Sequence, residues 1–176
     1  MNNVSNAGWD GLLDDGENIL WQGRPDGGFA FKTSMIFLTV FGLFFAGFAL
    51  FWMTMASMAG GYFWMFGLIH FAVGVGIIAG SILYPSYKRR RTWYTLTNRR
   101  AFIATVLPLL GKRLKSYPIT EDTQIEFQDN AIPSVMFATE TKRGKNSTYT
   151  VPIGFENISD ARQVLTLLRS VQKDQK

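Results

Sequence analysis

A stretch of 55 residues without a charged side chain, from Thr33 to Tyr87, constrains this chain more than any other feature. It contains two long apolar runs, at residues 35–56 and 62–84, separated by a short Gly- and Ser-containing segment. About 20 mostly apolar residues are enough for a helix to cross a bilayer. Because hydrocarbon offers no partner for backbone polar groups, each run is expected to be helical. The sequence therefore predicts a transmembrane helical hairpin over residues 33–87.

The charges that flank the hairpin predict its orientation. Arg24 and Lys32 precede the first run, and the connecting segment has no charge. Four consecutive basic residues follow the second run: Lys88, Arg89, Arg90 and Arg91. Basic residues next to spanning helices are retained on the cytoplasmic side. Both termini are therefore expected in the cytoplasm, with residues 1–32 forming an N-terminal tail.

Small residues recur at spacings of three and four in both runs. Residues at these spacings share one face of a helix and let a second helix approach closely. The pattern favours packing of the two helices against each other, with dimerisation through one stripe as the alternative. The helix-packing candidates are Gly42, Ala46, Ala49, Ala72, Gly76 and Gly80.

His70 is the polar exception within the second run, about 12 Å past Tyr62 along a helix. An ionisable residue at that depth is a candidate functional site. One interpretation is a neutral imidazole that hydrogen-bonds to a backbone carbonyl or to a Thr or Ser of the neighbouring helix. The other is contact with a ligand or cofactor, although haem ligation would need a second ligand from another chain.

After Arg91 the periodicity changes to that of short strands bounded by turn residues, which favours an antiparallel sheet or barrel. A strand near residues 18–23, before the hairpin, is expected against the following domain or at the headgroup level. The later strands are expected at residues 92–96, 101–106, 112–119, 123–128, 134–140 and 148–153.

The C-terminal segment has the periodicity of an amphipathic helix. Its apolar positions follow the i, i+3, i+4, i+7 pattern of one helix face, from Ala161 to Val171. Asn157 or Ser159 can cap it, and Asp160 is expected in its first turn. This helix should cover one face or end of the sheet, with residues 173–176 as a tail.

The order of these pieces resembles that of the bacterial PH-like (pleckstrin-homology-like) membrane proteins. The resemblance lies in Gly16–Pro25, the hairpin, the segment Tyr94–Arg100 and the segment Phe155–Ala161. It covers nearly the whole chain and implies a bent, seven-stranded sheet capped by a C-terminal helix over residues 88–172. It also implies a bacterial inner membrane, and it supplies no catalytic residues.

Composition argues against several functional classes. The chain has no Cys and one His, which excludes thiol chemistry and a multi-histidine metal site within one chain. The acids that follow the hairpin are not spaced as a general acid–base pair, and no phosphate-binding glycine pattern is present. We therefore expect neither an enzyme nor a cofactor or metal.

The region after the hairpin is basic, with sixteen basic and eight acidic residues over 88–176. Basic residues beside a membrane favour anionic headgroups over nucleic acid. The alternative is solvated turn charges that only set topology. We expect a membrane-anchored scaffold with an integral-membrane partner or a second copy, or a module that binds anionic lipid. The candidate lipid-surface residues are Lys88, Arg89, Arg90, Arg91, Arg99, Arg100, Lys112, Arg113 and Lys115.

Overall fold

The computed structural model describes residues 8–9, 11–26, 33–108, 111–144 and 147–175. The chain divides into two compact units. One is a helical hairpin spanning residues 28–87, and the other is a β-domain built from residues 1–27 together with 88–176. The hairpin is thus an insertion within the sequence of the β-domain. The strand expected near residues 18–23 belongs to the sheet, so the expected N-terminal tail is in part a component of the domain.

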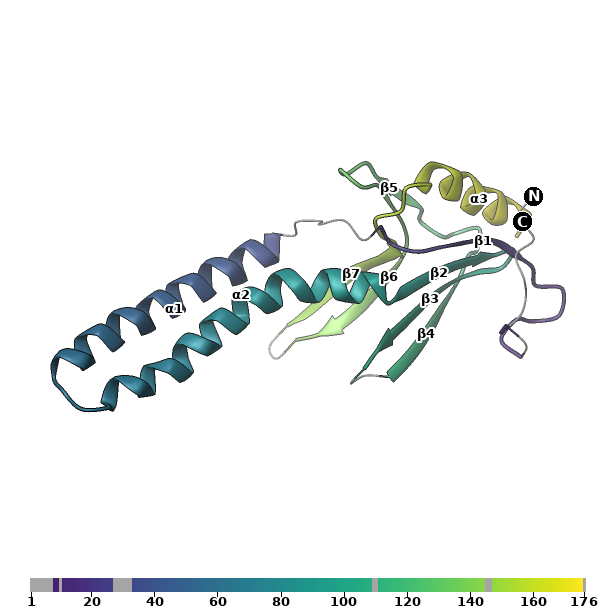
Figure 1. Cartoon of the computed structure of the whole chain (residues 1–176). Helices are drawn as coiled ribbons and strands as arrows, with labels where there is room; N and C mark the ends of the chain where they lie inside the picture. The colour runs from purple at the N-terminus through teal and green to yellow at the C-terminus, as the bar shows by residue number, and fades with distance from the viewer. Residues whose placement is uncertain (1–7, 10, 27–32, 109–110, 145–146, 176) are drawn as a thin grey trace. The chain divides into compact units, whose positions relative to one another are not determined.

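The hairpin consists of two long helices, α1 (Thr33–Met58) and α2 (Phe66–Arg90), joined through the short 3-10 helix η1 (Phe63–Met65) (Figure 1). The segments 35–58 and 63–90 have mean hydropathies of 2.2 and 2.1, and only 22% and 17% of their most apolar windows are buried. A core helix of a soluble protein would be mostly covered. Both helices are long enough to span a bilayer and fit a membrane-anchored domain.

Small side chains let the two helices approach closely. Gly74 of α2 lies against Ala46 of α1, and a Cβ atom built on Gly74 would lie 2.8 Å from the Ala46 backbone nitrogen. Gly42 is equally confined, by Ile78 and by the Gly74 carbonyl oxygen. Close backbone approach of this kind stabilises helix pairs in lipid through van der Waals packing.

The α1 stripe of Gly42, Ala46 and Ala49 is buried in this interface, as the sequence predicts for packing within the hairpin. The predicted α2 stripe is wrong for that role: Ala72, Gly76 and Gly80 are exposed, and nothing lies within 4 Å of a Cβ built on Gly76 or Gly80. The interface of α2 instead uses the buried small residues Gly67, Gly74 and Ser81. Their seven-residue spacing matches the repeat of closely packed helix pairs.

A hydrogen bond between the side chains of Thr39 and Ser81 joins the two helices toward the end of the hairpin that is away from the connecting turn. The Ser81 hydroxyl donates to the Ile78 carbonyl at 2.8 Å, so Thr39 is the donor in the 2.9 Å contact between Thr39 and Ser81. Both hydroxyl groups are thereby satisfied within the apolar segment.

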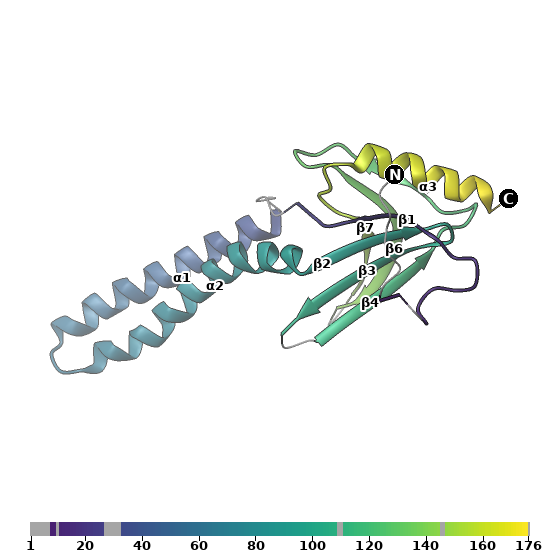
Figure 2. The same cartoon turned by 45° about the vertical axis from the view of Figure 1, so that its right-hand side comes forward.

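The β-domain contains two antiparallel sheets and a C-terminal helix (Figures 1 and 2). The four-stranded sheet has the order β1 (Ile19–Gly23), β2 (Thr92–Thr97), β3 (Arg100–Leu107) and β4 (Gly111–Pro118). The three-stranded sheet has the order β5 (Glu126–Gln128), β6 (Ser134–Arg143) and β7 (Thr148–Phe155). The strands expected from the sequence are all present, with ends shifted by up to three residues.

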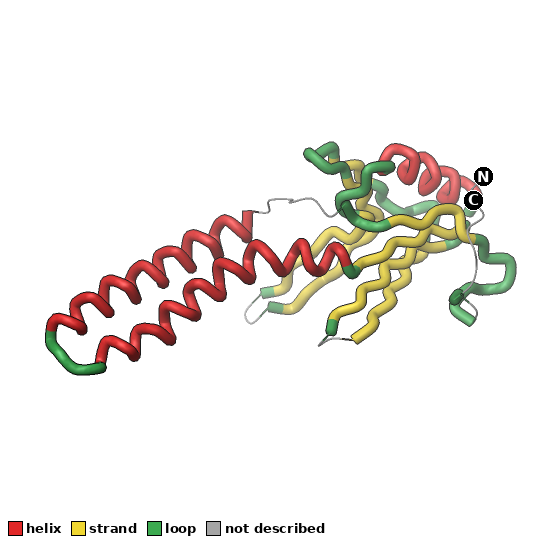
Figure 3. Tube along the Cα trace, viewed as in Figure 1, coloured by secondary structure: helices red, strands yellow, loops and turns green. Residues whose placement is uncertain are grey.

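Helix α3 (Ala161–Asp174) closes the core between the sheets (Figure 3). Its buried residues are Ala161, Val164, Leu168 and Val171, as the sequence periodicity predicts. They pack with Leu96, Phe155 and other fully buried side chains of both sheets. The expected cap is wrong in detail: Asp160 occupies the N-cap position and makes no side-chain hydrogen bond to the helix.

Candidate functional site

The segment before the hairpin is joined to the β2–β3 turn by a network of hydrogen bonds. Buried Glu17 accepts hydrogen bonds from Arg100 at 2.7 Å and from the Thr97 hydroxyl at 2.6 Å. The side chain of Asn98 accepts from the Asn18 N–H at 2.9 Å and donates to the Gly16 carbonyl at 3.1 Å. Two motifs about 80 residues apart in sequence thus form one structural contact.

The Glu17 carboxylate is held in its charged form. Burial alone would raise the pKa of Glu17, but hydrogen bonds from Arg100, Thr97 and the Asp14 N–H outweigh burial and lower the pKa to about 2. Arg100 also forms an ion pair with Asp14 at 3.0 Å. Arg100 therefore serves the fold and is not a free lipid-surface residue, contrary to the expectation from sequence.

A second network connects β1 to the segment that leads into α3. The Trp21 indole donates to the Asp160 carboxylate at 2.5 Å, and the Asp26 N–H donates to the Asn157 carbonyl at 2.6 Å. Asn157 has a φ of 54°, a left-handed conformation that asparagine tolerates better than most residues. Asp160 is thus a partner of Trp21, which explains why it does not cap α3.

The basic residues do not form one rim. Thr92 pairs with Thr105 and Leu107 pairs with Gly111, so the start of β2 and the β3–β4 connection share one end of the sheet. Arg99 lies in the β2–β3 turn, at the opposite end. Arg99 and Arg100 are therefore separated from the other candidates by the length of the strands.

Lys115 is also engaged within the domain. Its ammonium group contacts the Glu140 carboxylate at 2.5 Å, and the same oxygen accepts a hydrogen bond from Tyr117. The hydrogen bonds from Lys115 and Tyr117 lower the pKa of Glu140. Burial, together with that hydrogen bond, raises the pKa of the Tyr117 hydroxyl. Lys115 therefore joins β4 to β6 instead of facing outward alone.

The same contact fixes the direction of β6. The Tyr117 ring lies near Phe137 and Lys115 lies near Glu140, so β6 runs toward the start of β4. The start of β4 and the end of β6 consequently both carry basic residues, at the end of the domain where the chain arrives from α2. We call this set the basic end: Lys88, Arg90, Arg91, Lys112, Arg113, Lys142 and Arg143. Arg89, the remaining candidate there, is buried.

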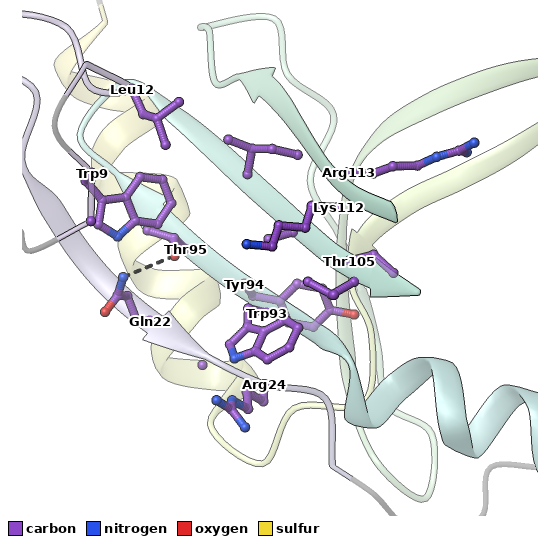
Figure 4. A pocket seen from close by; sticks show the side chains of 15 residues that line it. Trp9, Leu12, Gln22, Arg24, Trp93, Tyr94, Thr95, Thr105, Lys112 and Arg113 are labelled. Atoms are coloured by element: carbon purple, nitrogen blue, oxygen red, sulfur yellow. Dashed lines mark hydrogen bonds between the residues drawn. The ribbon is translucent and has the colours of Figure 1, made fainter. Parts of the chain in front are cut away.

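The outer face of the four-stranded sheet carries a cavity of about 640 Å³ (Figure 4). Thr95, Ala104 and Val106 form its floor, on strands β2 and β3. Trp9 and Leu12 of the N-terminal segment form one wall. Within this segment the Leu12 N–H donates a hydrogen bond to the Trp9 carbonyl, and Trp9 packs edge-on against Phe102 at 5.2 Å.

Two basic side chains complete the cavity. Arg24 lies over the ring of Trp93, with 4.8 Å between the guanidinium carbon and the ring centroid. Lys112, Arg113 and Leu114 of β4 also line the cavity, and the Arg113 side chain points away from that of Lys112 in Figure 4. None of the described residues that line the cavity is acidic. The site therefore combines aromatic and aliphatic walls with positive charge.

His70 lies on the outside of the hairpin, beside a smaller groove of about 240 Å³. Its Nδ1 is 3.3 Å from the Phe66 carbonyl oxygen, which confirms the predicted backbone contact. Because a carbonyl oxygen only accepts hydrogen bonds, Nδ1 carries the proton in this contact. The rings of Phe45 and Phe66 flank the imidazole at 6.1 and 5.1 Å. A ligand contact at His70 stays a prediction.

The sequence interpretation missed the cavity because its described residues come from five separate segments, within 8–12, 22–24, 93–95, 104–106 and 112–114. One signal was present: Trp9 and Trp93 are large aromatic residues outside the hairpin that belong to no predicted core face. In the part of the chain that the structure describes, no three potential metal-ligating side chains gather as a metal site. Compared with protein-family models, curated proteins and solved structures, the chain matches none.

Proposed function

We propose that this protein is a membrane-anchored, non-enzymatic adaptor whose hairpin crosses the bilayer twice and holds the β-domain at one leaflet. One observation carries the proposal. The hairpin is inserted between β1 and β2, which pair with each other in the same sheet. The chain must therefore leave and re-enter the same domain, and two crossings satisfy that requirement.

The bacterial PH-like resemblance supports a binding role. The resemblance implies one bent sheet of seven strands with a closing helix; the described chain has seven strands and a closing helix, with the strands divided between a four-stranded and a three-stranded sheet. Its motifs, however, are the residues that fasten β1 and α3 to the domain, such as Glu17, Arg100 and Asn157. The resemblance thus bears on the fold, and the ligand has to be argued from other residues.

The flanking charges support a cytoplasmic position for the β-domain, and the PH-like resemblance supports a bacterial inner membrane. The basic end adjoins α2, while the connection between the helices, Ser57 to Tyr62, has no charge. The positive-inside rule then assigns the β-domain to the cytoplasm.

Two acidic residues have a lowered pKa, Glu17 and Glu140. Each is ion-paired with a basic side chain, which supports a structural role for them over a catalytic one.

Strand β4 is the edge best suited to a protein partner. It is an eight-residue edge of its sheet and is exposed along nearly its whole length. The edge strand β7 carries Pro152, which lacks a backbone donor. An extended segment can add to a sheet edge through main-chain hydrogen bonds. Because Lys112 and Arg113 lie on β4, the partner segment should be acidic.

Site-specific photo-crosslinking in native membranes tests this role. A benzoylphenylalanine at Ser116 of β4 should give one discrete protein adduct that excess wild-type chain suppresses. The same probe at Ser170, on the exposed side of α3, is the control and should give none. Failure to form a protein adduct at Ser116, or equal adducts at both positions, contradicts the adaptor proposal.

A second candidate function is binding of anionic lipid by the basic end. Each basic residue near an anionic surface contributes about 1 kcal/mol, which falls off within a Debye length. In nanodiscs, anionic lipid should slow amide hydrogen exchange at the start of β4 and the end of β6, and 0.5 M salt should reverse this. Equal exchange in neutral and anionic nanodiscs contradicts it. The full chain is needed, because a fragment that starts at Lys88 lacks β1.

A further inference from the structure

We propose that the cavity on the outer face of the four-stranded sheet binds a single-chain anionic amphiphile, such as a fatty acid or a lysophospholipid. The cavity, of about 640 Å³, lies within the usual range for small-molecule sites. Its described lining residues all belong to the β-domain; it borders the start of β4, with which it shares Lys112, and it is separate from the hairpin groove. The proposal rests on the membrane anchoring proposed above, because the bilayer is the source of the ligand.

The walls of the cavity select an apolar body. Leu12 and Leu114 are 45% and 42% exposed, although both are large aliphatic side chains in an ordered domain. Trp9 and Trp93 are only half-buried and stand on opposite sides of the floor. Contiguous apolar surface that the fold leaves uncovered marks a binding site more often than chance exposure does. An acyl chain across Val106 and Leu114 would cover it.

The charges of the cavity select an anionic head. Within the described residues, Arg24 and Lys112 form no ion pair, and both reach the cavity. The contact with Trp93 orients the Arg24 guanidinium and leaves its N–H groups able to donate. A carboxylate or phosphate accepts charge-assisted hydrogen bonds from such groups, which are roughly twice as strong as neutral ones. A neutral or cationic head would leave both charges unmatched.

The chain connection keeps one wall of the cavity close to the C-terminal end of α2. Arg90 ends α2, and Trp93 follows three residues later. Three residues of extended chain span about 10 Å. Trp93, which forms one wall of the cavity, therefore lies within about 10 Å of the C-terminal end of α2. An amphiphile with one chain can leave a leaflet over such a distance, whereas a two-chain lipid would expose a second chain to water.

The five tryptophans of the chain provide a site-specific measurement. The full chain is labelled with 5-fluorotryptophan, placed in phosphatidylcholine nanodiscs and titrated with oleoyl-lysophosphatidic acid while fluorine NMR is recorded. The resonances of Trp9 and Trp93 should shift and saturate, and that of core residue Trp21 should not. Oleoyl-lysophosphatidylcholine and inorganic phosphate are titrated in parallel, and each should bind at least tenfold more weakly.

Two double variants with the same change in charge separate the cavity from surface attraction. R24Q/K112Q should weaken binding about tenfold or more, the effect of losing one or two charge-assisted hydrogen bonds. K142Q/R143Q changes two exposed residues of the basic end that do not line the cavity, and it should stay within about twofold. An unchanged Trp21 resonance shows that each variant is folded.

The results that would overturn the proposal are specific. Equal shifts with both lysolipids would contradict selection of an anionic headgroup. Saturation by inorganic phosphate alone would contradict binding of an acyl chain. Equal weakening by both double variants would show that the effect is surface attraction and not binding in the cavity. Trp52 and Trp64 of the hairpin segment report insertion through their broadening by a lipid-soluble paramagnetic probe. Without that broadening the anchoring proposal fails, whatever Trp9 and Trp93 show.

Discussion

At the scale of single residues, the contact between Glu17 and Arg100 decides how the N-terminal segment is held. The Glu17 side chain is fully buried, whereas that of Arg100 is 24% exposed. The two partners are therefore unequal: a stranded carboxylate would stay in the interior, while a stranded guanidinium can still reach water. Loss of either partner should loosen the segment that carries Trp9, and the two losses should differ in size.

The R100Q variant should lower the free energy of unfolding by about 3 kcal/mol, because removing one partner of a buried pair leaves an uncompensated charge. E17Q should cost less, since Arg100 retains access to solvent. R99Q is the matched control in the next residue: Arg99 is exposed, and its replacement should cost under about 0.5 kcal/mol. Denaturant unfolding of the full chain in uncharged detergent measures all three, and similar values for R99Q and R100Q would contradict the assignment.

Stability should depend on pH through the same carboxylate. The pKa of Glu17 is about 2 in the fold, against an ordinary value of 4.5. The unfolded chain therefore binds the proton more readily, and the contribution of Glu17 is complete above about pH 4.5 and lost as the pH falls toward 2. The melting temperature of the wild type should fall more steeply than that of E17Q between pH 5 and 3. Parallel curves would show that Glu17 is not held in its charged form.

At the scale of elements, the seam between α1 and α2 shows how far the sequence pattern reaches. The membrane-spanning segments, the positions of the strands along the chain and the buried face of α3 follow from hydropathy and periodicity, since each depends on local residues alone. The contact face of α2 cannot be predicted in this way, because α2 has two regular series of small residues. One is the predicted stripe of Ala72, Gly76 and Gly80, and the other is the observed seam of Gly67, Gly74 and Ser81. Only the rotation of α2 against α1 distinguishes them, and that rotation is set by tertiary packing.

The cavity was beyond sequence reasoning for a related reason. Trp9, Arg24, Trp93 and Lys112 lie in segments with no local sign that they meet. They come together because β1 pairs with β2 across the inserted hairpin and because Glu17 and Arg100 fold the N-terminal segment over the sheet. Long-range pairing of this kind leaves no period in the sequence.

Two glycines on the same helix test the seam. A side chain at Gly74 would collide with the backbone of Ala46, whereas one at Gly76 meets open space. G74I should therefore separate the helices and destabilise the hairpin by about 1–3 kcal/mol or more, as overpacking does. G76I should leave hairpin stability unchanged. Disulfide trapping between cysteines on α1 and α2 measures the separation, and equal effects of the two substitutions would reject this seam.

The same pair of variants separates the two uses predicted for the small-residue stripes. If the outward stripe of Ala72, Gly76 and Gly80 joins two copies, G76I should abolish a dimer that G74I leaves accessible to crosslinking in membranes. If it faces lipid only, neither variant should change the mass of the particle in nanodiscs. Mass photometry of the reconstituted chain reads this directly.

At the scale of the whole molecule, the insertion of a hairpin into a sheet predicts where each part lies with respect to the bilayer. Strands β1 and β2 pair with each other, so residues before and after the hairpin must lie on one side of the membrane. The loop side of the hairpin should lie on the other. This holds for either orientation of the protein and is therefore separate from the positive-inside argument.

Because the chain has no cysteine, single cysteines can report this arrangement without a background. D15C in the N-terminal segment and Q163C on α3 are exposed sites of the β-domain, and M58C ends α1 at a residue that is 82% exposed. In sealed bacterial cells, an impermeant maleimide should label M58C and spare the other two, which should react only after permeabilisation. Labelling of D15C and Q163C from opposite sides would be incompatible with β1–β2 pairing. Protection of all three would make the hairpin a re-entrant segment, and the adaptor would then be attached to one leaflet without crossing the membrane.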